Sequence, residues 1–387
     1  MTGTRASARR TPPVPAPALA ASVPPLLVAG AVLASYVVYA LLQNSVPPPE
    51  REGLPVLAHW DGEWYLDIAQ FAYGEGGRTD PAFRAEFFPL FPFLAAAVHF
   101  VLPFVPLDVA GSALNIGLVL AGVFLVDRIA LSAGHLWPLA HRCLLALFLV
   151  TVPNAFFFVC FYGEALLAFC AAVVIWGMRR DRLLVAAVGA ALACLSRPVG
   201  FLLAVPVALT ALRRPTARTS WAAGGIVAAG LATLFLVYQL LAGSPIAFVH
   251  AQFGNPEWQD LGLGADGLGG AWHHVRDAFV GPAYEGMGSS PIGVMMLVVV
   301  LVFAGLAWRW DWRLSVGALA VVLAPLPFQP LTALARYLVP TWFAWVGGVA
   351  VLRRRPAGVA VVATLCVLGL AANFHLLERF ARWSFVG

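Results

Sequence analysis

The chain contains no lysine and few charged residues of any kind. All 24 of its basic residues are Arg, and charged residues make up 11% of the 387 positions, whereas hydrophobic residues make up 61%. A soluble globular protein carries about 25% charged residues, so this composition excludes a soluble enzyme, a disordered tail protein and a nucleic-acid binder. We therefore expect an integral membrane protein whose first partner is the lipid bilayer.

Cysteine chemistry and nucleotide-binding motifs are also missing. The five cysteines lie inside apolar runs without C-x-x-C spacing, so neither a disulfide framework nor a zinc site is predicted. The chain has no P-loop and no G-x-G-x-x-G after a strand, which leaves nucleotide hydrolysis and nucleotide-sugar binding without support. We predict no cofactor, with a divalent metal kept as an open alternative.

Apolar runs recur along the chain, and clusters of Arg separate many of them. A membrane-spanning helix needs about 20 mostly apolar residues. The first run, 24–42, is too long for the hydrophobic region of a signal peptide and lacks a clear cleavage site, so it is predicted to be a retained span. The positive-inside rule assigns the Arg clusters to the cytoplasm. Six clusters hold 16 of the 24 Arg: Arg5/Arg9/Arg10, Arg128/Arg142, Arg179/Arg180/Arg182, Arg213/Arg214/Arg218, Arg309/Arg313 and Arg353/Arg354/Arg355.

Placing all six clusters on one side predicts an all-α polytopic protein with its N-terminus in the cytoplasm. A disordered N-terminus, 1–23, precedes a single transmembrane domain, 24–387, with outer loops 43–107 and 243–290. Four prolines in 87–106 favour a broken interfacial helix on the outer surface, with a full span as the alternative. The segments 183–196 and 199–212 are short, which indicates broken or tilted helices that line a cavity. The eleven predicted spans are 24–42, 108–128, 141–161, 162–178, 183–196, 199–212, 221–242, 291–308, 314–328, 336–352 and 357–377.

The densest polar and aromatic cluster, 59–70, follows the first span. Most acidic residues fall on this outer side, where chemistry is therefore expected. Asp61 is predicted to be the N-cap of a short helix at the membrane surface. Two interpretations stay open. Asp61 caps the helix while Trp60, Trp64 and Tyr65 anchor it at the lipid interface, or Asp61 is a general base that faces a sugar between these rings.

Three charged residues occupy positions that the topology does not explain. Glu164 follows Tyr162-Gly163 between two apolar runs, where an ionisable group is costly and usually faces a cavity or a partner. Arg197 and Arg336 lie at outer ends of spans, against the positive-inside pattern, and each suits bidentate binding of a phosphate or a carboxylate. The alternative is that both Arg pair with outer carboxylates such as Glu164.

The second outer loop, 243–290, contains histidines whose spacing matches no metal motif. The adjacent His273 and His274 are interpreted as surface residues. His250 and Gln252, near the start of the loop, are retained as candidate substrate contacts.

In this order, the motifs resemble those of the PIG-V-like mannosyltransferases, integral membrane glycosyltransferases of the GT-C class. The resemblance covers nearly the whole chain, with departures at Gly163, where the family usually has Ser, and at His59, where Arg is common. The motifs that carry it are Trp60-Asp61 with Trp64-Tyr65 and Ile68-Ala69, Phe87-Phe88-Pro89-Leu90-Phe91-Pro92, Pro153-Asn154-Ala155-Phe156-Phe157 leading to Tyr162-Gly163-Glu164, Ser196-Arg197-Pro198-Val199-Gly200, and Arg336-Tyr337-Leu338-Val339-Pro340.

The resemblance implies a GT-C-like bundle of about 11 transmembrane helices in a bacterial plasma membrane. Such proteins transfer mannose from polyprenyl-phosphate mannose to an acceptor on the extracytoplasmic side, and the family's catalytic Asp carries over onto Asp61. The acceptor, whether a glycolipid, a glycan or a protein, is not implied.

The chemistry agrees with this expectation. A polyprenyl phosphate is a good leaving group, so one base and one cationic clamp suffice, whereas a glycosidase needs two carboxylates. We expect Arg336 and Arg197 to hold the donor phosphate, with Glu164 and Tyr337 orienting the sugar or these Arg, and Tyr162 as a further substrate contact. Two rivals stay open: a GT-C transferase of another carrier-linked sugar such as arabinose, and a lipid-linked sugar transporter or flippase, which predicts paired halves with interrupted helices.

Overall fold

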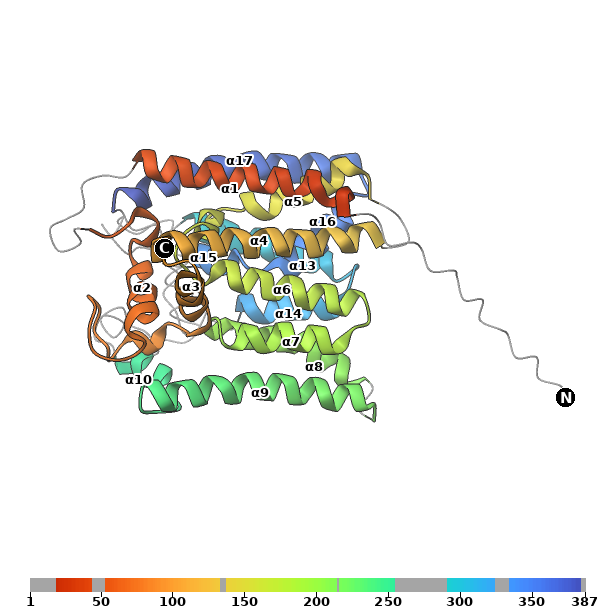
Figure 1. Ribbon diagram of the computed structural model, residues 1–387. Helices are drawn as coiled ribbons and strands as arrows, with labels where there is room; N and C mark the ends of the chain where they lie inside the picture. Colours follow the sequence, from red (N-terminus) through yellow and green to blue (C-terminus); the bar gives the residue numbers. More distant parts are fainter. Residues whose placement is uncertain are drawn as a thin grey trace.

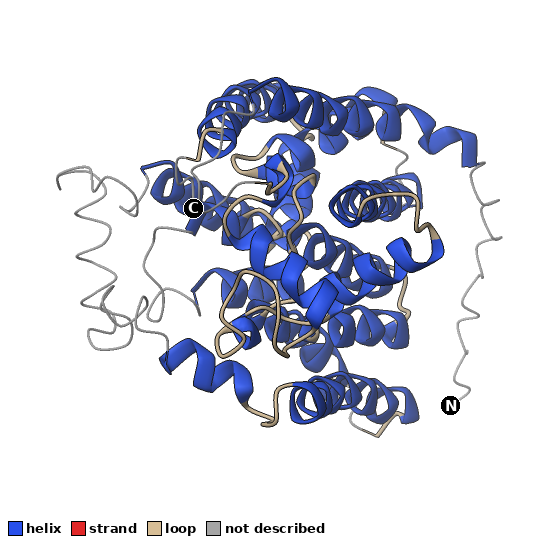
Figure 2. Ribbon diagram, turned by 60° about the vertical axis from the view of Figure 1, so that its left-hand side comes forward, coloured by secondary structure: helices blue, strands red, loops and turns tan. Residues whose placement is uncertain are grey.

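The computed structural model describes residues 19–43, 53–132, 137–213, 216–254, 291–323 and 334–383. Within these ranges every regular element is a helix, and the long helices run side by side in one bundle (Figures 1 and 2). The all-α prediction is therefore confirmed for the described part of the chain. Residues 1–18 of the predicted disordered N-terminus and residues 255–290 of the second outer loop lie outside it.

Four helices are long and apolar enough to cross a membrane. Each coincides with a predicted span, since a long, mostly apolar run favours a helix, which satisfies its own backbone hydrogen bonds. These helices indicate an integral membrane protein. They are α1 (Val23–Gln43), α4 (Leu107–Ser132), α9 (Arg218–Leu241) and α17 (Pro356–Ala381).

The other predicted spans correspond to shorter helices, so eleven full-length spans are not seen. Residues 324–328 of one predicted span lie outside the described ranges. The shorter helices are α5 (Leu139–Thr151), α6 (Glu164–Arg179), α7 (Leu183–Cys194), the 3₁₀ helix η6 (Pro198–Leu203) with α8 (Ala204–Leu212), α13 (Pro291–Ala307), α14 (Trp312–Leu323), and α15 (Leu334–Leu338) with α16 (Trp342–Leu352).

Two predicted spans are wrong as continuous helices, and proline is the reason in both. The span 141–161 ends as α5 at Thr151, because Pro153 disfavours the helical conformation of Val152, whose backbone is extended (ψ 141). Asn154 then adopts a left-handed conformation (φ 66) before the 3₁₀ helix η5 (Ala155–Phe158). The span 336–352 is interrupted between α15 and α16 at Pro340, which has no N–H to continue a helix.

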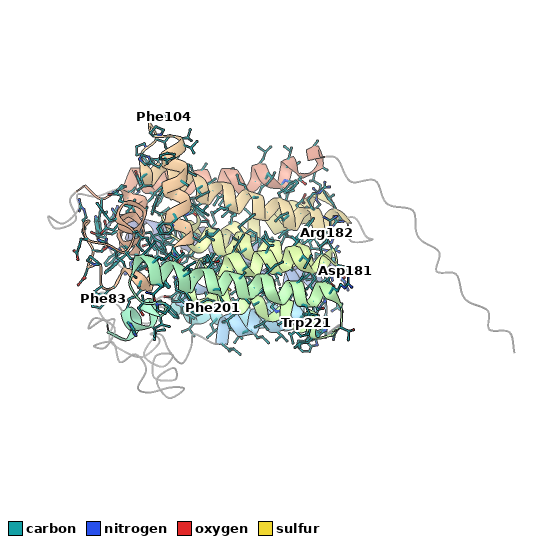
Figure 3. The ribbon with its side chains drawn as sticks, turned by 60° about the horizontal axis from the view of Figure 1, so that its bottom comes forward. Phe83, Phe104, Asp181, Arg182, Phe201 and Trp221 are labelled. Atoms are coloured by element: carbon teal, nitrogen blue, oxygen red, sulfur yellow. The ribbon has the colours of Figure 1, made fainter. Side chains whose placement is uncertain are left out.

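Two helices lie across one end of the bundle instead of along it. They are α2 (Asp61–Phe71) and α3 (Leu90–Val101) (Figure 1). Beyond α3 the chain exposes Phe100 and Phe104, which are 86% and 80% accessible, and Figure 3 shows Phe104 at a tip that points away from the bundle. This arrangement agrees with an interfacial helix between 87 and 106. We call this end the α2–α3 end.

The opposite end gathers the Arg clusters, as Figure 3 illustrates with Asp181, Arg182 and Trp221. Direct contacts link the described clusters to one another. Arg142 binds Asp127 at 2.7 Å, Arg180 donates to the carbonyl of Arg128, Arg179 lies 3.8 Å from Asp311, Arg213 lies over Trp312, and Arg353 lies over Trp137. Five of the six predicted clusters therefore share one end, which we call the Arg-rich end.

One hydrophobic core extends from α1 to α17. Small residues bring helices close together within it. A Cβ on Gly230 of α9 would lie 2.8 Å from Ala191 of α7, so the two helices can approach to this distance only with glycine there. A second cluster, which includes Ile68 and Tyr238, packs α2 against the end of α9 and against α10 (Ala247–Gly254).

Candidate functional site

Four charged side chains from distant parts of the sequence meet at the α2–α3 end. Nη1 of Arg336 lies 2.6 Å from Oδ2 of Asp61, and Nε of Arg336 lies 3.3 Å from Oε1 of Glu164. The same Glu164 oxygen accepts a hydrogen bond from Nη1 of Arg197. These two carboxylates and two guanidiniums form a network without net charge, which we call the charge network.

Burial differs sharply among its members. The side chain of Glu164 is 0% exposed and those of Arg197 and Arg336 are 8% exposed, whereas that of Asp61 is 28% exposed. Oε2 of Glu164 is buried and has no hydrogen-bond partner among the described residues. A buried acceptor without a donor is costly, so the network presents an accessible carboxylate at its edge and an unsatisfied oxygen inside.

Asp61 is not the helix cap that the sequence predicts. It is the first residue of α2, and the preceding Trp60 occupies the N-cap position without a side-chain cap hydrogen bond. The carboxylate stays in the first turn, where the helix dipole stabilises a negative charge, but its partner is Arg336. Trp60 has φ 58 and ψ −126, a conformation that is costly for a residue with a side chain and is concentrated at functional sites.

Aromatic residues at and just beyond the end of α17 hold this strained turn, a contact that no local pattern predicted. The ring of His59 stacks on Trp383 with 3.6 Å between centroids, and Nδ1 of His59 lies 3.2 Å from the carbonyl oxygen of Phe380. The hydroxyl of Tyr162 donates to the carbonyl of His59 at 2.7 Å. Turn 59–60 is thus fixed by residues far away in the sequence.

Arg197 is positioned by the break between α7 and η6. Its backbone is extended (φ −161, ψ 156), and Pro198 begins the 3₁₀ turn. A Cβ on Gly200 would lie 1.9 Å from the carbonyl oxygen of Ala193, so only glycine lets η6 fold back on α7. Pro198 and Gly200 therefore fix the position of Arg197 at this break.

Arg336 is surrounded by aromatic rings. Its guanidinium carbon lies 5.5 Å from the ring centroids of Phe157, Tyr162 and Tyr337. The guanidinium carbon of Arg197 also lies over the ring of Tyr337, 5.0 Å from its centroid. Phe157 follows the break at Pro153 and Arg336 precedes the break at Pro340, so the two helix interruptions create the site.

The predicted aromatic residues of α2 line the same region. Tyr65 is 3% exposed and its ring contacts Phe87 and Tyr162, with 5.2 and 6.0 Å between centroids. Burial raises the pKa of Tyr65 above its usual value, so its phenol stays neutral. Trp64 is half-buried and stacks on Phe87 at 5.3 Å. Tyr162 also lies against the guanidinium of Arg336, so these rings adjoin the charge network.

Of the two candidates from the second outer loop, His250 does not join the charge network. His250 is exposed on α10. Gln252 also belongs to α10, but its side chain lies outside the described residues, as do His273 and His274. In the part of the chain that the structure describes, no group of three or more His, Cys, Asp or Glu could hold a metal ion.

A further buried ion pair at the α2–α3 end, absent from the sequence predictions, organises the loop after α2. Arg84 is 0% exposed and donates to Oγ1 of Thr79 at 2.9 Å, to the carbonyl of Gly74 at 2.7 Å and to Oδ2 of Asp67 at 3.2 Å. Asp67 also accepts from the backbone of Arg78. Because Asp67 belongs to α2, this loop stiffens the helix that carries Asp61. Nothing in the local sequence distinguished Arg84 from other loop Arg.

Chemically, the arrangement offers one accessible carboxylate beside two fixed guanidiniums and a wall of aromatic rings. Comparison with protein-family models finds no match for the chain, and comparison with curated proteins finds none either.

Proposed function

We propose that this protein is a GT-C-like membrane glycosyltransferase that transfers mannose from polyprenyl-phosphate mannose to an acceptor hydroxyl, with inversion and with Asp61 as the base. The observation that carries the proposal is the charge network, in which Asp61 alone is substantially accessible while its partners are buried. A base must be accessible to the acceptor hydroxyl. The guanidiniums that bind the donor phosphate interact with it more strongly when they are shielded from water.

The arrangement suits transfer from an activated donor better than hydrolysis. A glycosidase needs a second carboxylic acid that protonates the leaving oxygen. Glu164 is fully buried and contacts both Arg197 and Arg336, so it is a poor candidate for proton donation. Polyprenyl phosphate leaves without protonation, and then a single base suffices.

The ion pair between Arg336 and Asp61 suggests an order in which the two substrates bind. In the free protein the guanidinium of Arg336 binds Asp61, so Oδ2 of Asp61 is engaged in an ion pair. The donor phosphate would compete for Arg336 and Arg197, since Arg binds phosphate with the same planar fork. Asp61 would then be released to take the proton of the acceptor hydroxyl, so the donor binds first.

The sugar would lie between the aromatic rings and the accessible carboxylate of Asp61. Trp64 stacked on Phe87 offers an apolar face, and Tyr65, Tyr162 and Tyr337 surround the network. Glu164, which is fully buried, would orient Arg336 and Arg197. We give no role to His250, because it is exposed and outside the network, or to Gln252.

The proposed topology follows the positive-inside rule. The Arg-rich end would face the cytoplasm together with the N-terminus, and the α2–α3 end would face the outside of a bacterial plasma membrane. About eleven helices would then cross the bilayer, the shorter ones being broken where they line the site.

The proposal is tested with purified protein in detergent. It is incubated with polyprenyl-phosphate mannose and a panel of lipid, glycan and peptide acceptors, and released polyprenyl phosphate is measured. Release that depends on an acceptor and disappears in Asp61→Asn supports the proposal. Release from polyprenyl-phosphate arabinose alone would assign another sugar. Movement of either lipid across a vesicle membrane without release would assign a flippase.

A further inference from the structure

The turn between α16 and α17, at the Arg-rich end, carries an unbalanced positive charge. Arg353, Arg354 and Arg355 follow one another there, and no ion pair involves them among the described residues. Asp127 and Asp311, two of the carboxylates at this end, already bind other Arg side chains. The third, Asp181, is exposed on the turn between α6 and α7.

An aromatic ring holds the guanidinium of Arg353 in place. Its guanidinium carbon lies 3.9 Å from the ring centroid of Trp137, a side chain that is only 6% exposed. In the part of the chain that the structure describes, Nε of Arg353 is buried without a hydrogen-bond partner, and the same holds for Nδ1 of His141, one turn after Trp137. Burial and the neighbouring Arg354 both lower the pKa of Arg353.

An apolar surface continues from this turn along α17. Arg354 and Arg355 are exposed, and below them Val361, Val367 and Leu368 are 49%, 68% and 60% accessible. Val361 and Leu368 are seven residues apart, so they lie on one face two turns from each other. A ligand at the turn therefore meets cationic groups at one end and an apolar ridge along the helix.

We propose that the α16–α17 turn and Trp137 form a binding site for an anionic phospholipid. The phosphate would be held by Arg353 on its aromatic support and by the exposed Arg354 and Arg355, and one acyl chain would lie along Val361 and Leu368. Basic pockets between membrane helices bind anionic headgroups by this combination of charge and apolar contact. The apolar ridge on α17 favours a lipid over free phosphate, because it offers a contact to an acyl chain. This site is at the end opposite the charge network and does not depend on the proposed transfer reaction.

The test uses a fluorescent short-chain phosphatidylglycerol, titrated by anisotropy into the full-length protein in neutral detergent. Phosphatidylcholine with the same chains serves as the uncharged counterpart, and inorganic phosphate is tested as a competitor. We expect phosphatidylglycerol to bind more tightly than phosphatidylcholine, with Arg353→Gln weakening it about fivefold and the triple variant Arg353→Gln/Arg354→Gln/Arg355→Gln about a hundredfold. Arg218→Gln removes an exposed Arg from the same end and is the matched control.

Unchanged affinity in the triple variant would overturn the site. An equal loss in Arg218→Gln would also overturn it, because attraction would then come from the whole Arg-rich end. Displacement by inorganic phosphate at the concentration of the lipid would overturn the assignment to a lipid. Thermal unfolding in phosphatidylcholine alone separates misfolding from lost binding, and Arg353→Lys, which keeps the charge but not the planar stacking on Trp137, should fold and bind with an intermediate affinity.

Discussion

The charge network predicts that Asp61 and Glu164 fail in different ways when each loses its charge. Asp61→Asn and Glu164→Gln preserve the size of the side chain and remove one negative charge. Asp61 is 28% exposed and its partner Arg336 retains Glu164 at 3.3 Å, so Asp61→Asn should cost about 1 kcal/mol of unfolding free energy. Removal of a base should lower turnover about 10² to 10⁴-fold.

Glu164→Gln, in contrast, should mainly lower the free energy of unfolding. The carboxylate is 0% exposed and contacts two guanidiniums, so the variant leaves Arg197 without a charged partner in a buried position. Breaking a buried pair costs about 3 to 5 kcal/mol. If Glu164→Gln cannot be purified, the double variant with Arg197→Gln removes one charge of each sign and should recover part of the lost stability.

Both quantities are measured on the same preparations. Unfolding in mixed micelles of mild detergent and dodecyl sulfate gives the free energy of unfolding, and released polyprenyl phosphate gives turnover. Glu63→Gln, in the same first turn of α2, is the control and should alter turnover less than threefold. If Asp61→Asn lost as much stability as Glu164→Gln and kept near wild-type turnover, Asp61 would be a structural partner of Arg336 and the mechanism would be refuted.

Three further predictions concern the phosphate clamp, the helix break and the topology. Arg336→Lys keeps the charge but not the planar fork, so donor KM should rise at least tenfold while acceptor KM stays constant; unchanged donor kinetics with lowered stability would leave Arg336 as a bridge only. Gly200→Ala forces a Cβ to within 1.9 Å of a backbone oxygen of α7, so unfolding should become easier by about 2 kcal/mol or more, and a variant with the stability of the parent would contradict the packing. In a Cys143→Ala background, an impermeant thiol reagent added outside intact cells should label Glu75→Cys and not Thr216→Cys, and the reverse pattern would invert the proposed orientation.

The sequence alone predicted the class of protein and the gathering of its Arg clusters at one end of the bundle. The near absence of charge, the apolar runs and the Arg clusters led to an all-helical membrane protein whose described clusters meet at one end. These features are local, because each apolar run must satisfy its backbone within its own helix. The residues of the site, Asp61, Glu164, Arg197 and Arg336, were also identifiable, since each stands out against apolar surroundings.

Their partnerships were not identifiable, because they depend on which helix ends meet. The sequence left open whether Arg336 faced a phosphate or a carboxylate, and packing brought it to Asp61 and Glu164. The support of the turn at Trp60 by the end of α17 has no local signature. Pro153 and Pro340 were visible in the sequence, but their effect was missed, because an apolar run predicts burial without saying whether the helix is continuous. Only the tertiary structure could decide these points, since a contact between distant residues depends on how all the intervening helices pack.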